Sequence, residues 1–221
     1  MSFKISGKLP SGKLKERIQL SPNYKDGAFQ NLSITPMKQE GVTYWKMTKE
    51  FLKKHPDTAP PAKLPFVKTD LNKLNRDEPV IVWFGHSSYF IRIENKNFLI
   101  DPVFSGNAAP FSFMVKAFRG SNNYKAEDMP AIDYLILTHD HYDHLDFKTI
   151  RKLKSKVNKI YCSLGLCSHL KHVKIANIPL PLFFVRALSD RAVPLEANEE
   201  IPFTLDIGFI RGQGDKLMVG T

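Results

Sequence analysis

Residues 132–146 read IDYLILTHDHYDHLD, a mostly apolar run that passes directly into a cluster of His and Asp residues. The apolar half, Ile132 to Leu137, predicts a strand that is buried on both faces, as in a parallel sheet. Five side chains able to bind a metal ion follow within eight residues, namely His139, His141, Asp143, His144 and Asp146. Such a density of ligands directly after a buried strand indicates a metal site rather than an ordinary polar loop.

The spacing of these ligands suggests two neighbouring metal ions. His139 and His141 are two positions apart at the end of an extended segment, so their side chains project to one side and can share one ion. The turn that follows directs Asp143 and His144 toward a second ion. Imidazole nitrogen and carboxylate oxygen suit zinc, with manganese or iron as alternatives. Two ions ~3.5 to 4 Å apart would deprotonate a bridging water and stabilise a phosphoryl or acyl oxygen, which is hydrolase chemistry.

The segments around this motif predict an α/β fold. We expect strands over residues 79–84, 88–93, 98–104 and 159–163, and an amphipathic helix with a solvated Lys-rich face over residues 147–157. The loop Gly85-His86-Ser87 separates the first two strands. The order strand, helix, strand around the metal motif is typical of layered α/β proteins.

The basic charge lies at the N-terminus. The chain has 221 residues and a formal net charge of +10, and residues 1–76 hold 15 Lys and Arg against 6 Asp and Glu. This segment is rich in Pro and turn formers, with one expected helix at residues 43–54. We therefore expect a basic N-terminal arm and linker over residues 1–76, and the main domain over residues 77–221.

The same features restrict the partners and the compartment. No apolar run approaches the ~18 to 20 residues that cross a bilayer, and residues 1–20 lack a signal-peptide core. The two Cys residues, Cys162 and Cys167, favour free thiols in a reducing compartment, so we expect a cytoplasmic protein. The arm allows at most peripheral contact with an anionic membrane, and without a reader motif we expect no specific nucleic acid.

The motif H-x-H-x-D-H at residues 139–144 resembles the signature of metallo-β-lactamase-fold hydrolases. Two further stretches, WFGHSSYFIRIENKNFLIDPVFS at residues 83–105 and SPNYKDGAFQNLS at residues 21–33, resemble one branch of that superfamily. The branch contains the N-acylphosphatidylethanolamine-hydrolysing phospholipase D and the L-ascorbate-6-phosphate lactonase. The resemblance covers roughly residues 19–170.

The resemblance implies an αββα sandwich, two zinc ions and cleavage of a phosphodiester or lactone by a metal-bound hydroxide. It places His139 and His141 on the first metal and Asp143 and His144 on the second, with Asp143 also orienting the attacking hydroxide. The substrate would be a small molecule or a phospholipid-like phosphodiester.

Three further side chains are candidates for contacting substrate or for supporting the metal ligands. His86 matches a position near the mouth of the family's site, although a His in such a turn can also serve only local hydrogen bonding. Asp101 follows the expected third strand, where a structural acceptor that closes its own loop is the alternative. Asp146 is a supporting residue rather than a ligand.

The sequence departs from the family pattern downstream. The stretch FVRALSDRAV, residues 184–193, resembles the segment that supplies a later metal-binding His, but Leu188 occupies that place and the last His is His172. We therefore expect a truncated hydrolase that holds mainly the N-terminal half of the sandwich. Its uncovered sheet face would favour a homo-oligomer.

Alternatives to an active enzyme follow from this departure. A short form could recruit ligands from Asp190, Asp206, Asp215 or another chain. An inactive remnant, or a non-enzymatic protein that binds an acidic surface through the basic arm, is the competing class. A nuclease of the same superfamily fits the net charge, but the W-x-G-H-x-S motif does not favour it.

Overall fold

The computed structural model describes residues 7–31, 41–53, 58–109, 115–121 and 123–172. All of these residues belong to the compact unit Met1–Val185.

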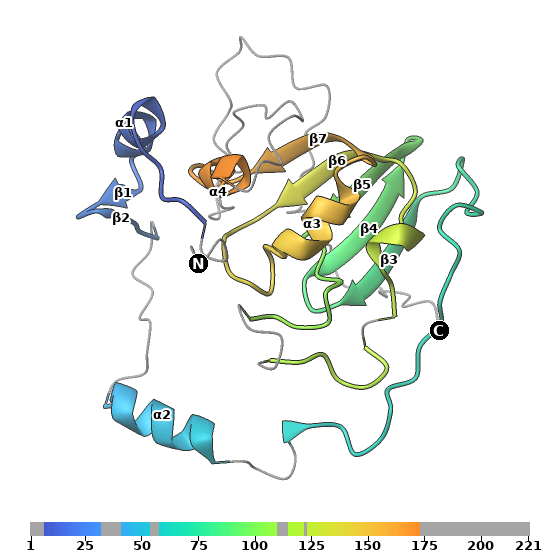
Figure 1. Ribbon diagram of the computed structural model, residues 1–221, viewed down its shortest axis with the longest axis horizontal. Helices are drawn as coiled ribbons and strands as arrows, with labels where there is room; N and C mark the ends of the chain where they lie inside the picture. Colours follow the sequence, from blue (N-terminus) through green and yellow to red (C-terminus); the bar gives the residue numbers. More distant parts are fainter. Residues whose placement is uncertain (1–6, 32–40, 54–57, 110–114, 122, 173–221) are drawn as a thin grey trace, which may run out of the picture. The chain divides into compact units, whose positions relative to one another are not determined.

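A mixed five-stranded sheet forms the centre of this unit (Figure 1), with the strand order β3-β4-β5-β6-β7. The strands are β3 (Val80–Gly85), β4 (Ser88–Ile93), β5 (Lys96–Ile100), β6 (Ile132–Leu137) and β7 (Val157–Cys162). The first three strands are antiparallel neighbours, whereas β5, β6 and β7 run parallel. The parallel half follows from the helix between β6 and β7, because a parallel pair needs a crossover connection. The expected α/β fold is thus confirmed.

Backbone turns set where the strands end. Glu94 and Asn95, with φ of 48° and 57°, form the tight turn between β4 and β5, and such left-handed pairs match the twist of a hairpin. β5 ends at Ile100 rather than at the expected residue 104, because Asp101 adopts a φ of 39° and leaves the extended conformation.

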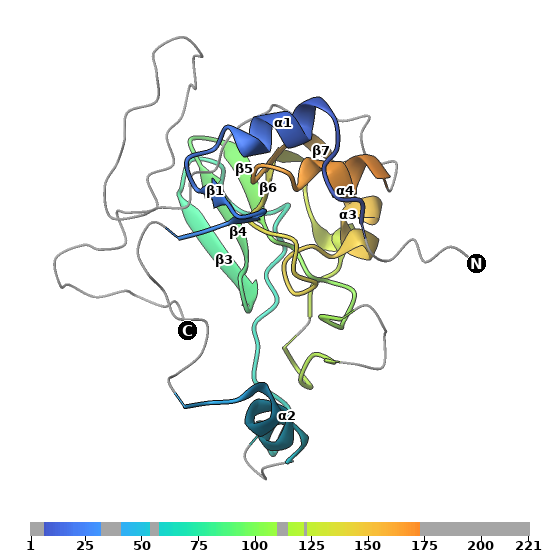
Figure 2. The same cartoon turned by 90° about the vertical axis from the view of Figure 1, so that its left-hand side faces the viewer.

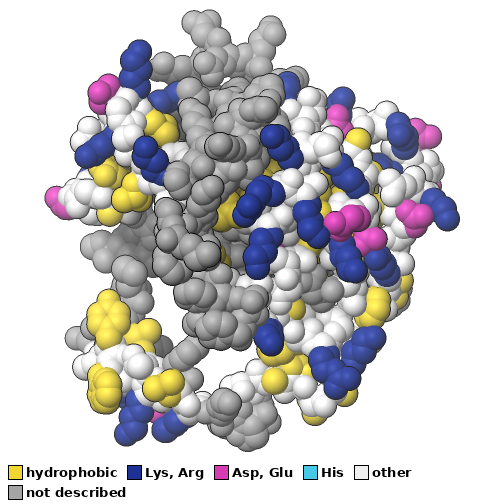
Figure 3. Space-filling view, viewed as in Figure 1, with side chains coloured by type: hydrophobic (Ala, Val, Ile, Leu, Met, Phe, Trp, Pro, Cys, Tyr) yellow, Lys and Arg dark blue, Asp and Glu magenta, His cyan; other side chains and the backbone are white. Residues whose placement is uncertain are grey.

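Two helices cover one face of the sheet (Figure 2), namely α3 (Phe147–Leu153) and α4 (Cys167–His172). The buried core joins the helices and the connecting loop to the sheet, and includes Phe90, Leu99, Leu135, Leu137, Leu145, Ile150, Leu153, Ile160 and Leu170. Lys148, Arg151 and Lys152 of α3 are exposed, and Figure 3 shows Lys and Arg side chains gathered on this side. The Lys-rich face of the predicted helix is therefore solvated.

The helix is shorter than expected. α3 ends at Leu153 and not at residue 157, because residues 154–156 turn the chain into β7. The Lys156 ammonium group donates to the carbonyls of Ala126, Glu127 and Met129, which fixes this turn against a short 3-10 helix, η2 (Ala126–Asp128). β7 consequently begins at Val157, opposite Ile132 and two residues earlier than predicted.

The opposite face of the sheet is only partly covered by the described residues. Tyr134 and Ile136 of β6 are half-buried, so this strand is not buried on both faces as its apolar run suggested. Ile81 and Trp83 of β3 are 70% and 64% exposed. Exposed apolar side chains of this kind are expected on the face of a sheet that packs against another layer.

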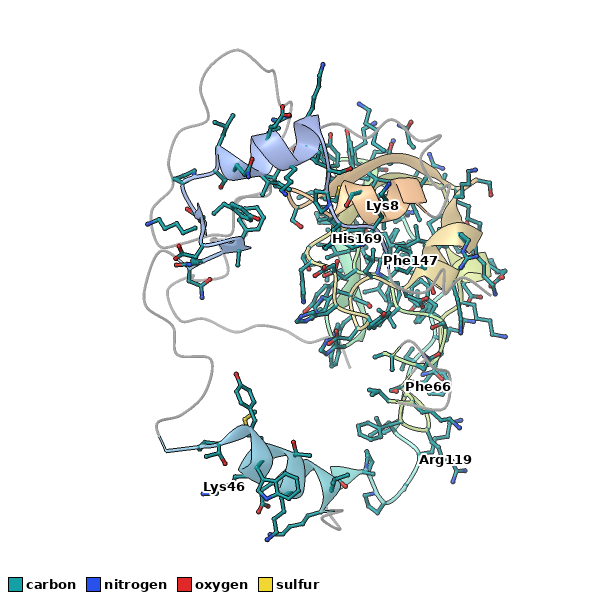
Figure 4. All side chains as sticks on the ribbon, turned by 60° about the vertical axis from the view of Figure 1, so that its left-hand side comes forward. Lys8, Lys46, Phe66, Arg119, Phe147 and His169 are labelled. Atoms are coloured by element: carbon teal, nitrogen blue, oxygen red, sulfur yellow. The ribbon has the colours of Figure 1, made fainter. Side chains whose placement is uncertain are left out.

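The N-terminal segment contains more structure than the sequence indicated. Besides the expected helix, which is α2 (Tyr44–Leu52), it contains α1 (Lys13–Gln19) and a hairpin of β1 (Tyr24–Lys25) and β2 (Ala28–Phe29). Ser168 donates to the Lys8 carbonyl, and Lys8 and His169 lie side by side in Figure 4. None of the helices within the described ranges is both long and apolar enough to cross a bilayer.

One cysteine differs from the expectation. Cys162 at the end of β7 is disulfide-bonded in this structure, so the prediction of a free thiol is wrong at this position.

Residues just before β3 take part in the core. Leu71 is 1% exposed and packs in the buried cluster, and the Tyr124 hydroxyl accepts from the Thr69 amide at 2.8 Å. The Arg92 guanidinium donates to the Leu74 carbonyl at 2.9 Å. These contacts tie the end of the predicted linker to the sheet.

Truncating Leu71 tests this attachment. Leu71→Ala should lower the free energy of unfolding by about 2–5 kcal/mol, because it leaves a cavity in the core. Leu20→Ala, at a leucine that is 84% exposed, serves as the control and should change it by less than about 0.5 kcal/mol. Urea unfolding followed by circular dichroism measures both, and equal effects would show that Leu71 is not part of the core.

Candidate metal centre

The metal-motif loop begins where β6 ends and is anchored at both sides. Leu145 is buried, and its amide and that of His144 donate to the His141 carbonyl, which closes a tight turn. Asp146 then caps α3 by accepting from the amides of Lys148 and Thr149. A buried leucine and a helix cap on one side, and a central strand on the other, hold the histidines in place.

Asp101 lies at the centre of the site and is 1% exposed. One carboxylate oxygen accepts from the Thr138 amide at 2.8 Å. The other accepts from the Thr138 hydroxyl at 2.5 Å and pairs with His144 Nδ1 at 2.8 Å. Asp101 therefore joins the end of β5 to both ends of the metal-motif loop. Its left-handed backbone conformation costs of order 1 kcal/mol or more, and such strain is concentrated at functional sites.

The contact with Asp101 determines how His144 presents its second nitrogen. Because the carboxylate can only accept, His144 Nδ1 must carry the proton and donate. In the neutral imidazole, Nε2 then keeps its lone pair, and this atom lies 3.8 Å from an Asp143 oxygen. A carboxylate that orients an imidazole in this way is the usual support of a metal-binding histidine.

Three imidazoles of the metal motif gather beside Asp101. The ring centroids of His139 and His144 are 3.8 Å apart, and those of His139 and His141 are 4.7 Å apart. Burial, and then the neighbouring rings of His144 and His141, lower the pKa of His139 below its ordinary value. A lowered pKa favours the neutral imidazole, which is the form that binds a metal ion.

His86 meets Asp143 from the opposite side of the site. Its Nε2 lies 2.9 Å from Asp143 Oδ2, and its ring lies 5.1 Å from that of His144. The Trp83 indole donates to the His86 carbonyl at 2.9 Å, which holds the turn between β3 and β4. Burial raises the pKa of Asp143, but its own backbone amide, its electrostatic interaction with His144 and its hydrogen bond with His86 together hold the pKa below its ordinary value.

Two groups of side chains bring ligand atoms within 4.8 Å of one another: Asp101, His139 and His144, and His86, Asp143 and His144. The structure thus brings together Asp143 and His144, as the spacing predicted, and places His139 beside them. His141 contacts His139 but is in neither group. Imidazole nitrogens with carboxylate oxygens match the preference of zinc and similar divalent ions, so the residues fit a metal centre.

Asp146 supports the site indirectly. Besides capping α3, its carboxylate accepts from the Ser105 amide at 2.9 Å and from the Thr149 hydroxyl at 2.6 Å. It therefore fixes the segment that follows β5 to the segment that follows the metal motif.

Sequence reasoning missed two neighbours of the site, Thr138 and His169. Thr138 contacts both Asp101 and His139, and His169 Nε2 lies 3.6 Å from an Asp140 oxygen. Thr138 could have been identified because it is a hydroxyl residue directly before His139, the first histidine of the motif. No local pattern could indicate the approach of His169, because it depends on how α4 packs. The positions discussed for missing ligands, Leu188, Asp190, Asp206 and Asp215, lie outside the described residues.

A comparison with protein families agrees with this geometry. The family model described as the beta-lactamase superfamily domain matches residues 96–216, more than half of the chain. The chain belongs to this superfamily. The expected metallo-β-lactamase fold is thereby confirmed.

Curated relatives of this superfamily chain match it over part of their length. An uncharacterised protein of Mycobacterium tuberculosis is 29% identical over 68% of this chain and 41% of its own length. N-acyl-phosphatidylethanolamine-hydrolyzing phospholipase D 1 of Caenorhabditis elegans is 32% identical over 41% of this chain and 26% of its own. A metal-dependent hydrolase of Saccharolobus solfataricus is 36% identical over 40% of this chain and 34% of its own. The chain spans less than half the length of each.

Removing the charge of Asp101 tests its central position. Asp101→Asn should weaken zinc binding by about 10–100-fold, because the amide can no longer hold both Thr138 and His144 as donors. Asp133→Asn on the neighbouring strand β6, where the Asp133 carboxylate accepts from the Asn97 backbone amide, is the control and should leave zinc affinity unchanged. Competition with a chromophoric chelator measures both affinities. Equal affinity of the Asp101 variant and the unmodified chain would contradict this arrangement.

Proposed function

We propose that the chain forms the metal-binding part of a hydrolase that cleaves a phosphodiester or a lactone. The observation that carries this proposal is the placement of His139 and His144 beside Asp101, with Asp143 3.8 Å from His144 on the other side of that ring's ligand group. The family membership and the name of the Saccharolobus relative support a metal-dependent hydrolase. The name of the Caenorhabditis relative supports a phosphodiester of the phospholipid type.

Each side chain has a role in this proposal. His139, His141 and His144 would hold divalent ions, with zinc favoured by the donor set and manganese or iron as alternatives. Such ions supply Lewis acidity that activates water and stabilises negative charge on a phosphoryl or acyl oxygen. Asp143 orients the attacking water and accepts its proton. His86 lies at the edge of the site, where it holds Asp143 and faces the incoming substrate.

A pocket beside the centre favours a substrate with an apolar part. Its volume is about 310 Å³, room for roughly ten groups of the size of water, and its lining includes Phe84, Val103 and Phe118. His86 lines the same pocket and also contacts Asp143, so His86 separates a group bound in the pocket from Asp143. Lys116 also lines the pocket, and its positive charge suits an anionic substrate.

Removing the metal or Asp143 tests the reaction itself. Turnover of phosphodiester and lactone substrates should cease with a chelator and return with zinc or manganese. Asp143→Asn should lower kcat by about 100-fold or more, because a positioned carboxylate contributes that much to proton transfer. Asp133→Asn should retain full activity. Activity that survives both the chelator and Asp143→Asn would contradict the proposal.

Filling the pocket tests the substrate preference separately. Ala117 lines the pocket, and Ala117→Trp should raise KM for a lactone with a long alkyl substituent by about tenfold, while KM for its methyl analogue stays unchanged. Ala28→Trp, on the exposed β2 strand, is the control. An equal effect on both lactones would show that the pocket does not bind the alkyl group.

A further inference from the structure

We propose that Thr138 is a positioning residue that fixes the tautomer of His139, so that Asp101 controls two histidines at once. Asp101 orients His144 directly and His139 through the Thr138 hydroxyl. The proposal deepens the proposed function, because it assumes that His139 Nε2 faces the metal centre.

The hydroxyl of Thr138 has two partners and one proton. Its Oγ1 lies 2.5 Å from Asp101 Oδ2 and 2.9 Å from His139 Nδ1. The Asp101 carboxylate has no proton to give, so the hydroxyl must donate its single proton to Asp101. Toward His139 the same oxygen can then only accept.

The direction of these two hydrogen bonds fixes which nitrogen of His139 carries the proton. Nδ1 must carry the ring proton and donate to Thr138, which leaves Nε2 with the lone pair in a neutral imidazole. His144 reaches the same state through its own bond between Nδ1 and Asp101. Both rings therefore keep an unprotonated Nε2, although only His144 is hydrogen-bonded to Asp101 directly.

The surroundings hold this chain of hydrogen bonds in place. Asp101 is buried, and the Thr138 amide donates to its other oxygen at 2.8 Å, so the threonine is fixed by two bonds to one carboxylate. The Asp101 amide donates to the Ile136 carbonyl, and the Asp101 carbonyl accepts from the Ser88 hydroxyl. The backbone of Asp101 is therefore held against β6 and the start of β4.

Nuclear magnetic resonance of the metal-free full chain tests the proposal without any turnover. At pH 8, where histidine is neutral, the ¹⁵N signals of an imidazole distinguish the nitrogen that carries the proton from the bare one. His139 and His144 should both show protonated Nδ1 and bare Nε2. Protonated Nε2 on His139 in the unmodified chain would overturn the proposal without any variant.

Two matched variants isolate the hydroxyl. Thr138→Val keeps the shape of the side chain but removes Oγ1, and should shift His139 toward the other tautomer while His144 stays unchanged. Thr138→Ser keeps the hydroxyl and should restore the original spectrum. Zinc affinity should fall about tenfold in Thr138→Val and return in Thr138→Ser, as expected for a residue that orients a ligand.

The outcomes separate this proposal from the proposed function. An unchanged His139 spectrum in Thr138→Val would overturn the role of Thr138 even if the chain hydrolyses its substrate. The expected spectra in a chain that hydrolyses nothing would support Thr138 and count only against the hydrolase.

Discussion

A buried carboxylate, Asp101, connects the two segments from which the candidate metal centre is built. It ends β5 in a left-handed conformation and accepts from the Thr138 amide, the Thr138 hydroxyl and His144 Nδ1. A carboxylate withdrawn from water is tolerated only when such donors satisfy it. The same three bonds that make Asp101 stable in the interior therefore position the metal-motif loop, so folding and site formation depend on one group.

The sequence predicted the parts of the fold that depend on local pattern. The apolar run before Thr138 is β6, the helical spacing after Asp146 is α3, and the H-x-H-x-D-H motif identified the superfamily. The ends of helices and strands were harder to predict, because they depend on contacts with residues distant in the sequence. α3 stops at Leu153 because Lys156 is bound by the carbonyls around η2, and β5 stops where Asp101 turns toward Thr138.

The sequence predicted which residues form the site but not which of them contact one another. Spacing alone grouped His139 with His141 and Asp143 with His144, whereas the structure also brings His86 to Asp143 across 57 positions of sequence. It also gives Asp101 a partner in His144, 43 positions away. Contacts of this kind arise from the order of strands in the sheet, in which the β3–β4 turn and the ends of β5 and β6 meet at one edge. They give the superfamily motif its orientation.

The number of metal ions bound per folded chain tests the central claim most directly. Native mass spectrometry of the full chain, loaded with zinc and then dialysed against metal-free buffer, measures this number. We expect two ions per chain, one for each group of ligands, and fewer in His144→Ala, because His144 belongs to both groups. A chain that retains no zinc, or a His144→Ala variant that retains as much as the unmodified chain, would contradict the assignment of these residues as a metal centre.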